Sequence, residues 1–578
     1  MLYLGIILSI VCLCTAQRYP ITAAWFNDHF SRSNWNSTLY NFTRNGGDTV
    51  LLKPKQFLFR SQQDMEADPD FASCSTTETD TGPTCFEDAK KEINQLGYKI
   101  ASFASYKSGE NFGKTVIECP AFEKKLVRAR TYIRLVLQTK ITPQSQPCDF
   151  PKGSSVVVLF TYFDGVDSNE LLVRIAAEKN MSVYLGMPEV PSTTGPYHQY
   201  FFSYLDWFSR LIVDQRQRYL GLTVNNSIYT TAYDAVSGYN TGEARPLGQF
   251  NTDEDTLNLY SAQSGTVHFY GKKVLVSSSV DLRKTGGFSI DEHVHGFNAL
   301  VNASSADVMN IHEGRGYGNA CYYWPTQNVL PISQVDKTLD AVLHYQNPQL
   351  KQNITFDDFF AGSIQQVMES LFIAREALEK NNHSFDIWLN IEAFESLRDN
   401  PCLPTSGSGI SVSTDRVTKG RLDMALSAGA VFVQKVAVST WDPYFTCTPK
   451  NSSSTLAQQV YNDAGRPIIT HCSFHSQYNR SVVVIGFNLL GETQGFTVTW
   501  SDTGHTRHNS SVHGYYFEAA YGSEHHLVPS LIYTQLYDPY NVMQLNPKGT
   551  VRVKAGGANR ACVFTYDYTD VDNNTSNK

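Results

Sequence analysis

Three acidic residues follow apolar runs that are typical of buried β-strands. Glu392 follows the run 386–391, Glu313 comes shortly after the run 307–311, and Asp442 follows a third such run. Two carboxyl groups that face each other across one opening can cleave a glycosidic bond, one as general acid and the other as base or nucleophile. We therefore predict Glu392 and Glu313 as catalytic candidates, with Asp442 in support.

Residues that suit sugar binding lie near these acids. Aromatic rings offer flat apolar faces, while His and Asn side chains form hydrogen bonds with hydroxyl groups. The candidates are Trp25, His312, Asn390, Tyr317, Trp324 and Trp441. Structural alternatives remain open, because acids at strand ends also cap helices or pair with arginines such as Arg315, and the run 322–324 also suits loop packing.

Other kinds of chemistry find little support. The chain has no Gly-x-Ser-x-Gly elbow and no His-Glu-x-x-His, and the Asp-Glu-His-Val-His segment at 291–295 has the wrong spacing for a zinc helix. We predict no metal and no cofactor. Net charge is -8 over 578 residues, and 18% of residues are charged. No strong positive field would attract nucleic acid, so carbohydrate or a glycoconjugate is the expected partner.

The first sixteen residues form a short apolar run that ends in small residues, which predicts a secretory signal peptide cut after Ala16. No other apolar stretch approaches the roughly 18–20 residues that cross a bilayer. Many Asn-x-Ser/Thr sequons agree with export to the extracellular space. They are Asn36, Asn41, Asn180, Asn225, Asn302, Asn353, Asn382, Asn451, Asn479, Asn509, Asn573 and Asn574.

From residue 21 to about 444, short apolar runs alternate with amphipathic helical stretches, as in parallel β/α folds. Eight runs are candidate strands: 21–26, 49–53, 182–187, 219–224, 273–280, 307–311, 386–391 and 435–440. Helical periodicity is clear at 168–179, with a serine cap, and at 357–378. Eight strands with helical crossovers predict a (β/α)8 barrel of TIM type, whose functional groups lie at the carboxyl ends of the strands.

The barrel is expected to span residues 17–447, with an insertion at about 58–165 between the second and third strands. The insertion holds Cys74, Cys85, Cys119 and Cys148, which suggest disulfides, a helix near 86–96, and two strand-like runs at 99–103 and 156–163. Either run could replace one of the eight barrel strands, and the sequence leaves this open.

After Cys447 the chain contains only short alternating or β-branched runs. They predict an all-β, sandwich-like module at 465–568, followed by a polar, disordered tail at 569–578. The expected strands are 481–487, 496–500, 515–519, 531–536, 550–554 and 561–566.

Six short motifs resemble, in order, an uncharacterised glycoside-hydrolase-like barrel family, domain of unknown function 4434. The motifs are Ile21-Thr-Ala-Ala-Trp-Phe, Gly47-Asp-Thr-Val-Leu-Leu, Ser182-Val-Tyr-Leu-Gly-Met, His312-Glu-Gly-Arg-Gly, Leu389-Asn-Ile-Glu-Ala-Phe and Val438-Ser-Thr-Trp-Asp-Pro-Tyr. The resemblance covers roughly residues 20–445 and implies a TIM barrel and a carbohydrate substrate. One departure is that the expected fourth strand, followed by 225–227, ends without the family's acidic residue unless Asp234 replaces it.

Two functional hypotheses follow. The first is a secreted glycosidase-like protein that uses Glu392 and Glu313. The second is a non-catalytic extracellular protein, such as a matrix component or a carbohydrate-binding glycoprotein, that keeps the barrel as a scaffold. The retained acids favour the first hypothesis, and the missing fourth-strand acid favours the second.

Overall fold

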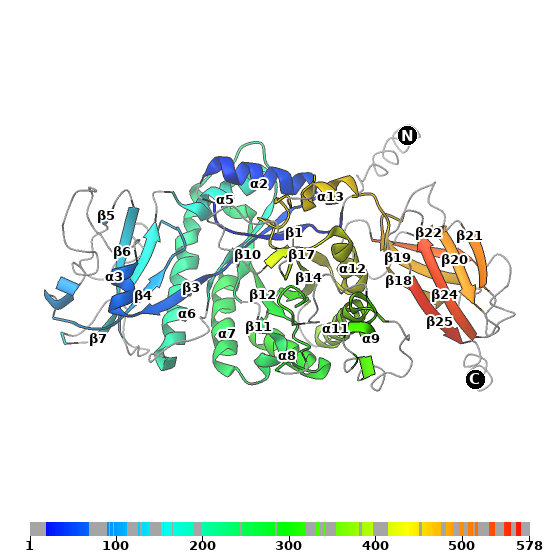
Figure 1. The fold of residues 1–578 in the computed structure, drawn as a ribbon. Helices are drawn as coiled ribbons and strands as arrows, with labels where there is room; N and C mark the ends of the chain where they lie inside the picture. Colours follow the sequence, from blue (N-terminus) through cyan, green and yellow to red (C-terminus); the bar gives the residue numbers. More distant parts are fainter. Residues whose placement is uncertain are drawn as a thin grey trace.

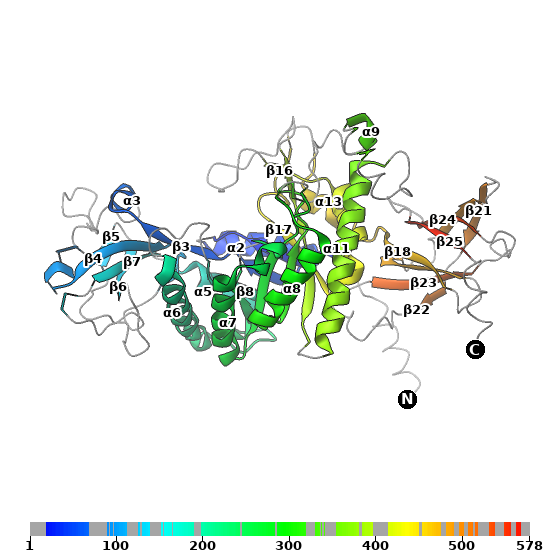
Figure 2. The same cartoon turned by 90° about the horizontal axis from the view of Figure 1, so that it is seen from below.

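The protein consists of a central barrel with a β-rich part at each end (Figure 1), and the same order is visible in the perpendicular view (Figure 2). The structure is a computed structural model. It describes residues 19–29, 31–68, 90–91, 93–95, 97–111, 125–127, 130–138, 152–153, 155–163, 166–189, 198–242, 245–283, 286–319, 330–335, 337, 340–341, 354–380, 384–396, 414–449, 453–475, 481–489, 496–501, 507–512, 515–517, 531–537, 548–555 and 562–567.

Eight parallel strands close into a barrel, which confirms the predicted fold class. The strands are β1 (Ala23–Phe26), β2 (Thr49–Leu52), β8 (Ser182–Gly186), β10 (Val236–Asn240), β12 (Lys273–Ser279), β13 (Val308–His312), β14 (Asp386–Glu392) and β17 (Lys435–Ser439). Each pairs with the next in chain order, β10 pairs with β12, and β17 returns to β1. The two-residue strand β11 (Arg245–Pro246) extends β12 at its carboxyl end.

Helices surround the barrel and bury the outer faces of its strands. They are α2 (Arg32–Arg44), α5 (Ser168–Glu178), α6 (His198–Arg216), α7 (Glu254–Phe269), α8 (Ile290–Ser304), α11 (Phe356–Glu379) and α12 (Lys419–Gly429), with the shorter α9 (Ile332–Val335) and α13 (Leu456–Asn462). The described residues also include the 3-10 segments η2 (Gln217–Gly221), η3 (Ala232–Ala235), η4 (Leu247–Asn251) and η6 (Ala430–Phe432). The two predicted helices are α5 and α11, but Asp167 caps α5 in place of the expected serine, because its side chain accepts the Glu170 N–H.

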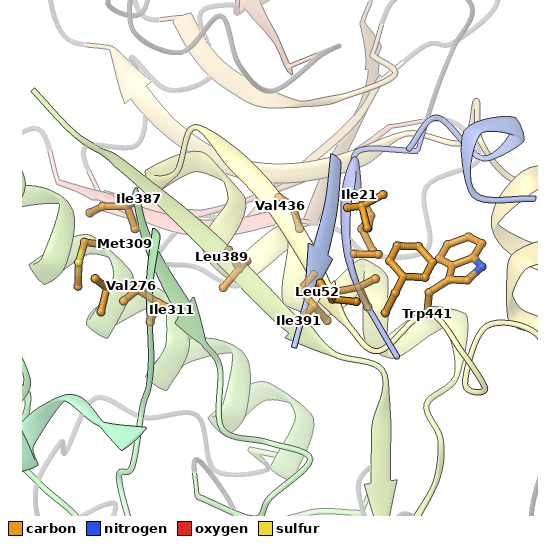
Figure 3. Close-up of a cluster of buried hydrophobic side chains, with 14 of the residues drawn as sticks. Ile21, Leu52, Val276, Met309, Ile311, Ile387, Leu389, Ile391, Val436 and Trp441 are labelled. Atoms are coloured by element: carbon orange, nitrogen blue, oxygen red, sulfur yellow. The ribbon is translucent and has the colours of Figure 1, made fainter. Parts of the chain in front are cut away.

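Alternation along the strands creates two separate cores. Outward side chains such as Met309, Ile311 and Leu389 pack against the helices in one large cluster, part of which Figure 3 shows. Inward side chains form a smaller cluster that fills the barrel. Its members are Ala23, Trp25, Leu51, Tyr184, Leu275, Val308, Trp388 and Ala437. Alternate residues of each strand therefore face the barrel axis, and the residues between them face the helices.

The prediction that residues 219–224 form the fourth barrel strand was wrong. Residues 217–221 form the 3-10 helix η2, and Thr223 makes only an isolated bridge to Thr231. The fourth strand is β10, which sequence patterns missed because it contains Gly238 and few β-branched residues. The glycine is required there, since a Cβ atom would lie 2.2 Å from the Lys273 carbonyl oxygen of the adjoining strand.

The insertion between β2 and α5 contributes a six-stranded sheet with the order β5-β6-β7-β4-β3-β9. Its elements are β3 (Lys55–Arg60), α3 (Gln62–Ala67), β4 (Lys99–Tyr106), β5 (Lys125–Val127), β6 (Arg130–Gln138) and β7 (Ser155–Phe163), and β9 (Pro188–Glu189) joins it from beyond β8. The two additional strand-like runs are thus β4 and β7, outside the barrel. The four cysteines and most of the predicted helix lie outside the described residues.

A buried ion pair joins this sheet to the barrel. Glu110 follows β4, and both of its carboxylate oxygens accept hydrogen bonds from Arg216, at the end of α6, at 2.9 Å. A third donor of Arg216 binds the Gly186 carbonyl oxygen at the end of β8, also at 2.9 Å. Both ionic side chains are buried. The pair therefore connects the insertion to the core of the barrel at a site without access to water.

The carboxyl-terminal strands form two antiparallel four-stranded sheets, β18-β19-β23-β22 and β21-β20-β24-β25. Their bounds are β18 (Ile468–His475), β19 (Ser481–Phe487), β20 (Phe496–Ser501), β21 (Arg507–Val512), β22 (Tyr515–Phe517), β23 (Leu531–Tyr537), β24 (Lys548–Ala555) and β25 (Cys562–Asp567), while β15 (Phe394–Ser396) and β16 (Thr414–Arg416) pair beside the barrel. A disulfide between Cys472 and Cys562 joins the two sheets. Among the described residues, no helix is long and apolar enough to cross a membrane.

Candidate functional site

The inner wall of the barrel becomes polar toward the carboxyl ends of the strands. On β13, Asn310 and His312 share the inward face with Val308 of the interior cluster, and on β14 Asn390 follows Trp388 in the same way. Asn390 is the centre of one hydrogen-bonded chain. Its Oδ1 accepts from the Ser439 hydroxyl at 3.0 Å, and its Nδ2 lies 2.9 Å from His312 Nε2.

This arrangement fixes the protonation of His312. Because the Asn390 amide nitrogen faces Nε2, that ring nitrogen accepts a hydrogen bond and the proton resides on Nδ1. Burial, with a contribution from the charge of Lys53, lowers the pKa of His312 to about 3. The imidazole is therefore neutral at physiological pH and presents an N–H group.

A second chain crosses the barrel one layer deeper. Asn310 donates to the Ser277 hydroxyl at 3.2 Å, and that hydroxyl donates to Asn240 Oδ1 at 3.3 Å. Several buried polar atoms of the inner wall have no hydrogen-bond partner among the described residues, among them Trp25 Nε1, His312 Nδ1, Asn310 Oδ1 and, at the end of β12, Ser279 Oγ. The Trp25 and His312 ring centroids are 6.2 Å apart. Buried polar atoms are rarely left unpaired, so this cluster has unused capacity for hydrogen bonds.

Glu392 is also on the inward face of β14, but its carboxylate binds the loop that follows β13. The side chain is fully buried. It accepts hydrogen bonds from the backbone N–H groups of Gly314, Gly316 and Tyr317. Burial and the nearby charge of Glu313 raise the pKa of Glu392 to about 8, against the effect of those donors and of Arg315. A protonated acid is the expected form at neutral pH.

Two glycines allow this loop to approach Glu392. Gly314 has φ +78°, and a Cβ atom on it would lie 2.4 Å from the Val280 carbonyl oxygen. A Cβ atom on Gly316 would lie 2.6 Å from Phe394. Both glycines therefore permit the tight turn that follows Glu313. Its consequence is a carboxylate bound by backbone donors, which sequence patterns did not reveal.

Glu313 points away from the barrel axis. The Glu313 backbone N–H donates to the Asn390 carbonyl oxygen at 3.1 Å, so Glu313 continues the hydrogen bonding between β13 and β14. Successive residues of a strand point to opposite faces, and because His312 points inward, the Glu313 side chain points outward. There it is buried, and Arg315 Nη2 lies 3.1 Å from its carboxylate. Burial raises the pKa of Glu313 despite the arginine. The prediction that Glu392 and Glu313 face each other across one opening is therefore wrong, because successive residues of paired strands point to opposite faces.

The residues predicted after β17 lie on the outer side of the barrel. Trp441 is buried and stacks on Phe445, with ring centroids 4.5 Å apart, in the outer core of Figure 3. Asp442 accepts a hydrogen bond from Thr446 at 2.6 Å and lies 3.6 Å from His29. Neither residue joins Glu392 at the inner wall, because the chain has left the strand.

Other predicted positions have mixed outcomes. The Tyr317 side chain is exposed beside the carboxyl ends of the strands, and its ring centroid is 4.9 Å from that of Phe394. Trp324 lies outside the described residues. Asp234 accepts the N–H groups of Thr230 and Thr231 at the start of η3, so it acts as a helix cap.

Because the fourth barrel strand is β10 and not the predicted run 219–224, the acidic residue expected at its end must be sought after β10. The strand β10 ends at Asn240, and the next acidic residue in the sequence is Glu243, outside the described residues. The corrected fourth strand therefore also ends without an acidic residue, and Glu243 follows its last residue by three positions. Asn240, Ser277 and Ser439 were also missed, because single small polar residues inside apolar runs are weak signals without the barrel register.

Comparison with known proteins characterises only the insertion. A family model described as a domain of unknown function, DUF8405, matches residues 60–163. This range corresponds to the inserted sheet that precedes α5. No curated protein matches the sequence. The fold and site define a TIM-type barrel protein that carries an uncharacterised inserted domain.

Proposed function

We propose that this protein is exported, N-glycosylated and binds carbohydrate at the carboxyl-terminal end of its barrel. The observation that carries the proposal is the polar inner wall, where Trp25, His312 and Asn310 each retain an unpaired donor or acceptor. A saccharide offers hydroxyl groups that both donate and accept, so it suits a mixed set of this kind. The exposed ring of Tyr317 adds a flat apolar surface at the same end.

Further support comes from the surface and from the resemblance. The sequon residues Asn41, Asn180, Asn225 and Asn302 are exposed, as attachment of a glycan requires. The resemblance to the glycoside-hydrolase-like family, domain of unknown function 4434, agrees with the barrel and with a carbohydrate ligand. Fold alone is a weak argument for function, so the inner wall carries more of the proposal.

Hydrolysis is the second candidate, and the raised pKa of Glu392 favours it. An acid that stays protonated at neutral pH can donate a proton to a leaving group. Against this, Glu392 is fully buried and Glu313 faces the other way. The first acidic residue in the sequence after β10 is Glu243, which is the remaining candidate for a second acid. Binding without cleavage is therefore the primary proposal.

A screen of the protein, secreted from a eukaryotic host, against a glycan array and chromogenic glycosides tests both candidates. We expect binding to a defined group of glycans without turnover, and a decrease in mass after enzymatic removal of N-glycans. Absence of binding to every glycan would reject the primary proposal. Turnover that disappears in both Glu392→Gln and Glu243→Gln would establish hydrolysis, whereas turnover that survives Glu392→Gln would exclude Glu392 from the mechanism.

A further inference from the structure

Lys53 directly follows β2 and points toward the barrel axis. Leu51, two residues earlier, belongs to the interior cluster, and alternate residues of a strand share a face. The charge of Lys53 also acts on His312, on the strand opposite β2 in the ring. The lysine therefore extends over the polar inner wall, and its side chain is exposed to water.

Three acids near the carboxyl ends of other barrel strands have partners other than Lys53. Asp28, after β1, lies 2.5 Å from Lys55. Asp281, after β12, lies 2.6 Å from Arg283. The carboxylate of Glu392 binds backbone N–H groups. Asp28 and Asp281 are thus paired with other cations, and Glu392 is expected to be protonated at neutral pH, so Glu189 is the acid whose charge acts on Lys53.

Lys53 itself forms no ion pair or hydrogen bond with any described residue. Burial by the surrounding protein and the positive charge of Lys55 lower the pKa of Lys53, and the negative charge of Glu189 offsets these two effects only in part. An anion bound beside Lys53 would stabilise the charged form of the lysine. The position of the lysine above the inner wall, rather than on an outer surface, makes it available to a ligand bound there.

The unpaired groups near the carboxyl ends of the strands can all donate a hydrogen bond, and one of them, the Ser279 hydroxyl, can also accept. His312 offers Nδ1–H, and Trp25 offers Nε1–H, with each side chain slightly exposed, at 6% and 4%. Asn310 Oδ1 is an acceptor, but it belongs to a fully buried side chain one layer deeper. Two N–H groups beside an ammonium group match a ligand group that only accepts hydrogen bonds and carries negative charge.

We propose that Lys53, His312 and Trp25 bind the carboxylate or sulfate group of an acidic saccharide. The inference rests on the proposed carbohydrate-binding function and narrows its ligand class. Lys53 supplies the charge, and the two ring N–H groups orient the anionic group over the inner wall. Neutral saccharides would satisfy the N–H groups but leave the lysine charge uncompensated.

Isothermal titration with defined oligosaccharides tests this directly. The probes are an unsulfated oligosaccharide with uronic acids, a sulfated one without carboxylates, a neutral one of equal length, and inorganic sulfate alone. We expect an acidic probe to bind about tenfold or more tightly than the neutral one, and Lys53→Met to remove that preference. Binding of the acidic probe should also weaken when ionic strength rises from about 0.05 M to about 0.3 M.

Lys273→Met is the matched control, because Lys273 is an exposed lysine at the opposite, amino-terminal end of the barrel. It should retain the preference. Equal binding of acidic and neutral probes, unchanged in Lys53→Met, would overturn the anionic ligand class and leave carbohydrate binding intact. Binding of inorganic sulfate that depends on Lys53, without any saccharide binding, would support an anion site and reject the carbohydrate proposal. Absence of binding to every probe would overturn both.

Discussion

Replacement of Arg216 by methionine is expected to lower the free energy of unfolding of the barrel by about 3–5 kcal/mol. The change removes both hydrogen bonds to Glu110 and leaves that buried carboxylate with only the more distant Arg218, 4.0 Å away, as a counter-ion. It also leaves the Gly186 carbonyl oxygen without its donor. Loss of the hydrogen-bonded partner of a buried charge is among the largest destabilising effects of a single substitution. Differential scanning calorimetry measures the loss as a lower transition temperature.

Two further variants isolate the cause. Arg210→Met removes an ion pair with Asp206 on the same helix, but that pair is exposed and should be worth less than about 1 kcal/mol. The double variant Arg216→Met with Glu110→Leu removes both charges, and it should recover much of the lost stability. If Arg216→Met proved no more harmful than Arg210→Met, the ion pair would not connect the insertion to the barrel as described.

Glu392→Gln is expected to change how stability depends on pH. Burial and the charge of Glu313 raise the pKa of Glu392 from an ordinary value near 4.5 to about 8. Between these values the folded protein binds a proton that the unfolded chain does not. The stability from this group is fully present below the unfolded pKa and is lost as pH rises through the folded pKa. Each pKa unit corresponds to about 1.4 kcal/mol.

The glutamine variant is neutral at every pH, so it should lose less stability than the wild type between about pH 5 and about pH 9. Denaturant unfolding at both pH values measures the difference, which should reach several kcal/mol. Glu254→Gln serves as control, since Glu254 is an exposed carboxylate on α7. Parallel pH curves for wild type and Glu392→Gln would show that Glu392 is ionised in the folded protein.

Seven of the eight barrel strands were predictable, because β-branched and apolar runs such as 182–187 and 273–280 match buried parallel strands. The exception, β10, depends on tertiary contact. Its glycine is unfavourable for a strand in isolation, yet close approach of β12 requires it. The competing segment at 219–224 is apolar, but it begins within a 3-10 helix. Close approach of two backbones is not visible in a pattern of side-chain types.

Strand register decides which of the predicted site residues face the inner wall and which face outward. Trp25, His312 and Asn390 meet at the inner wall because they occupy alternate positions near the carboxyl ends of their strands. Glu313 is one residue beyond His312 and therefore faces outward, where Arg315 binds it. A difference of one residue reverses the direction of a side chain, and the sequence alone did not fix where each strand ended.

Titration of the best glycan against Trp25→Phe most directly tests whether the inner wall binds carbohydrate. The substitution removes the unpaired indole N–H and keeps an aromatic ring. We predict roughly tenfold weaker binding, the size of one lost hydrogen bond. Trp441→Phe removes a similarly buried, unpaired indole N–H on the outer side of the barrel and should leave the affinity unchanged. Equal affinity in Trp25→Phe and the wild type would contradict binding at the inner wall.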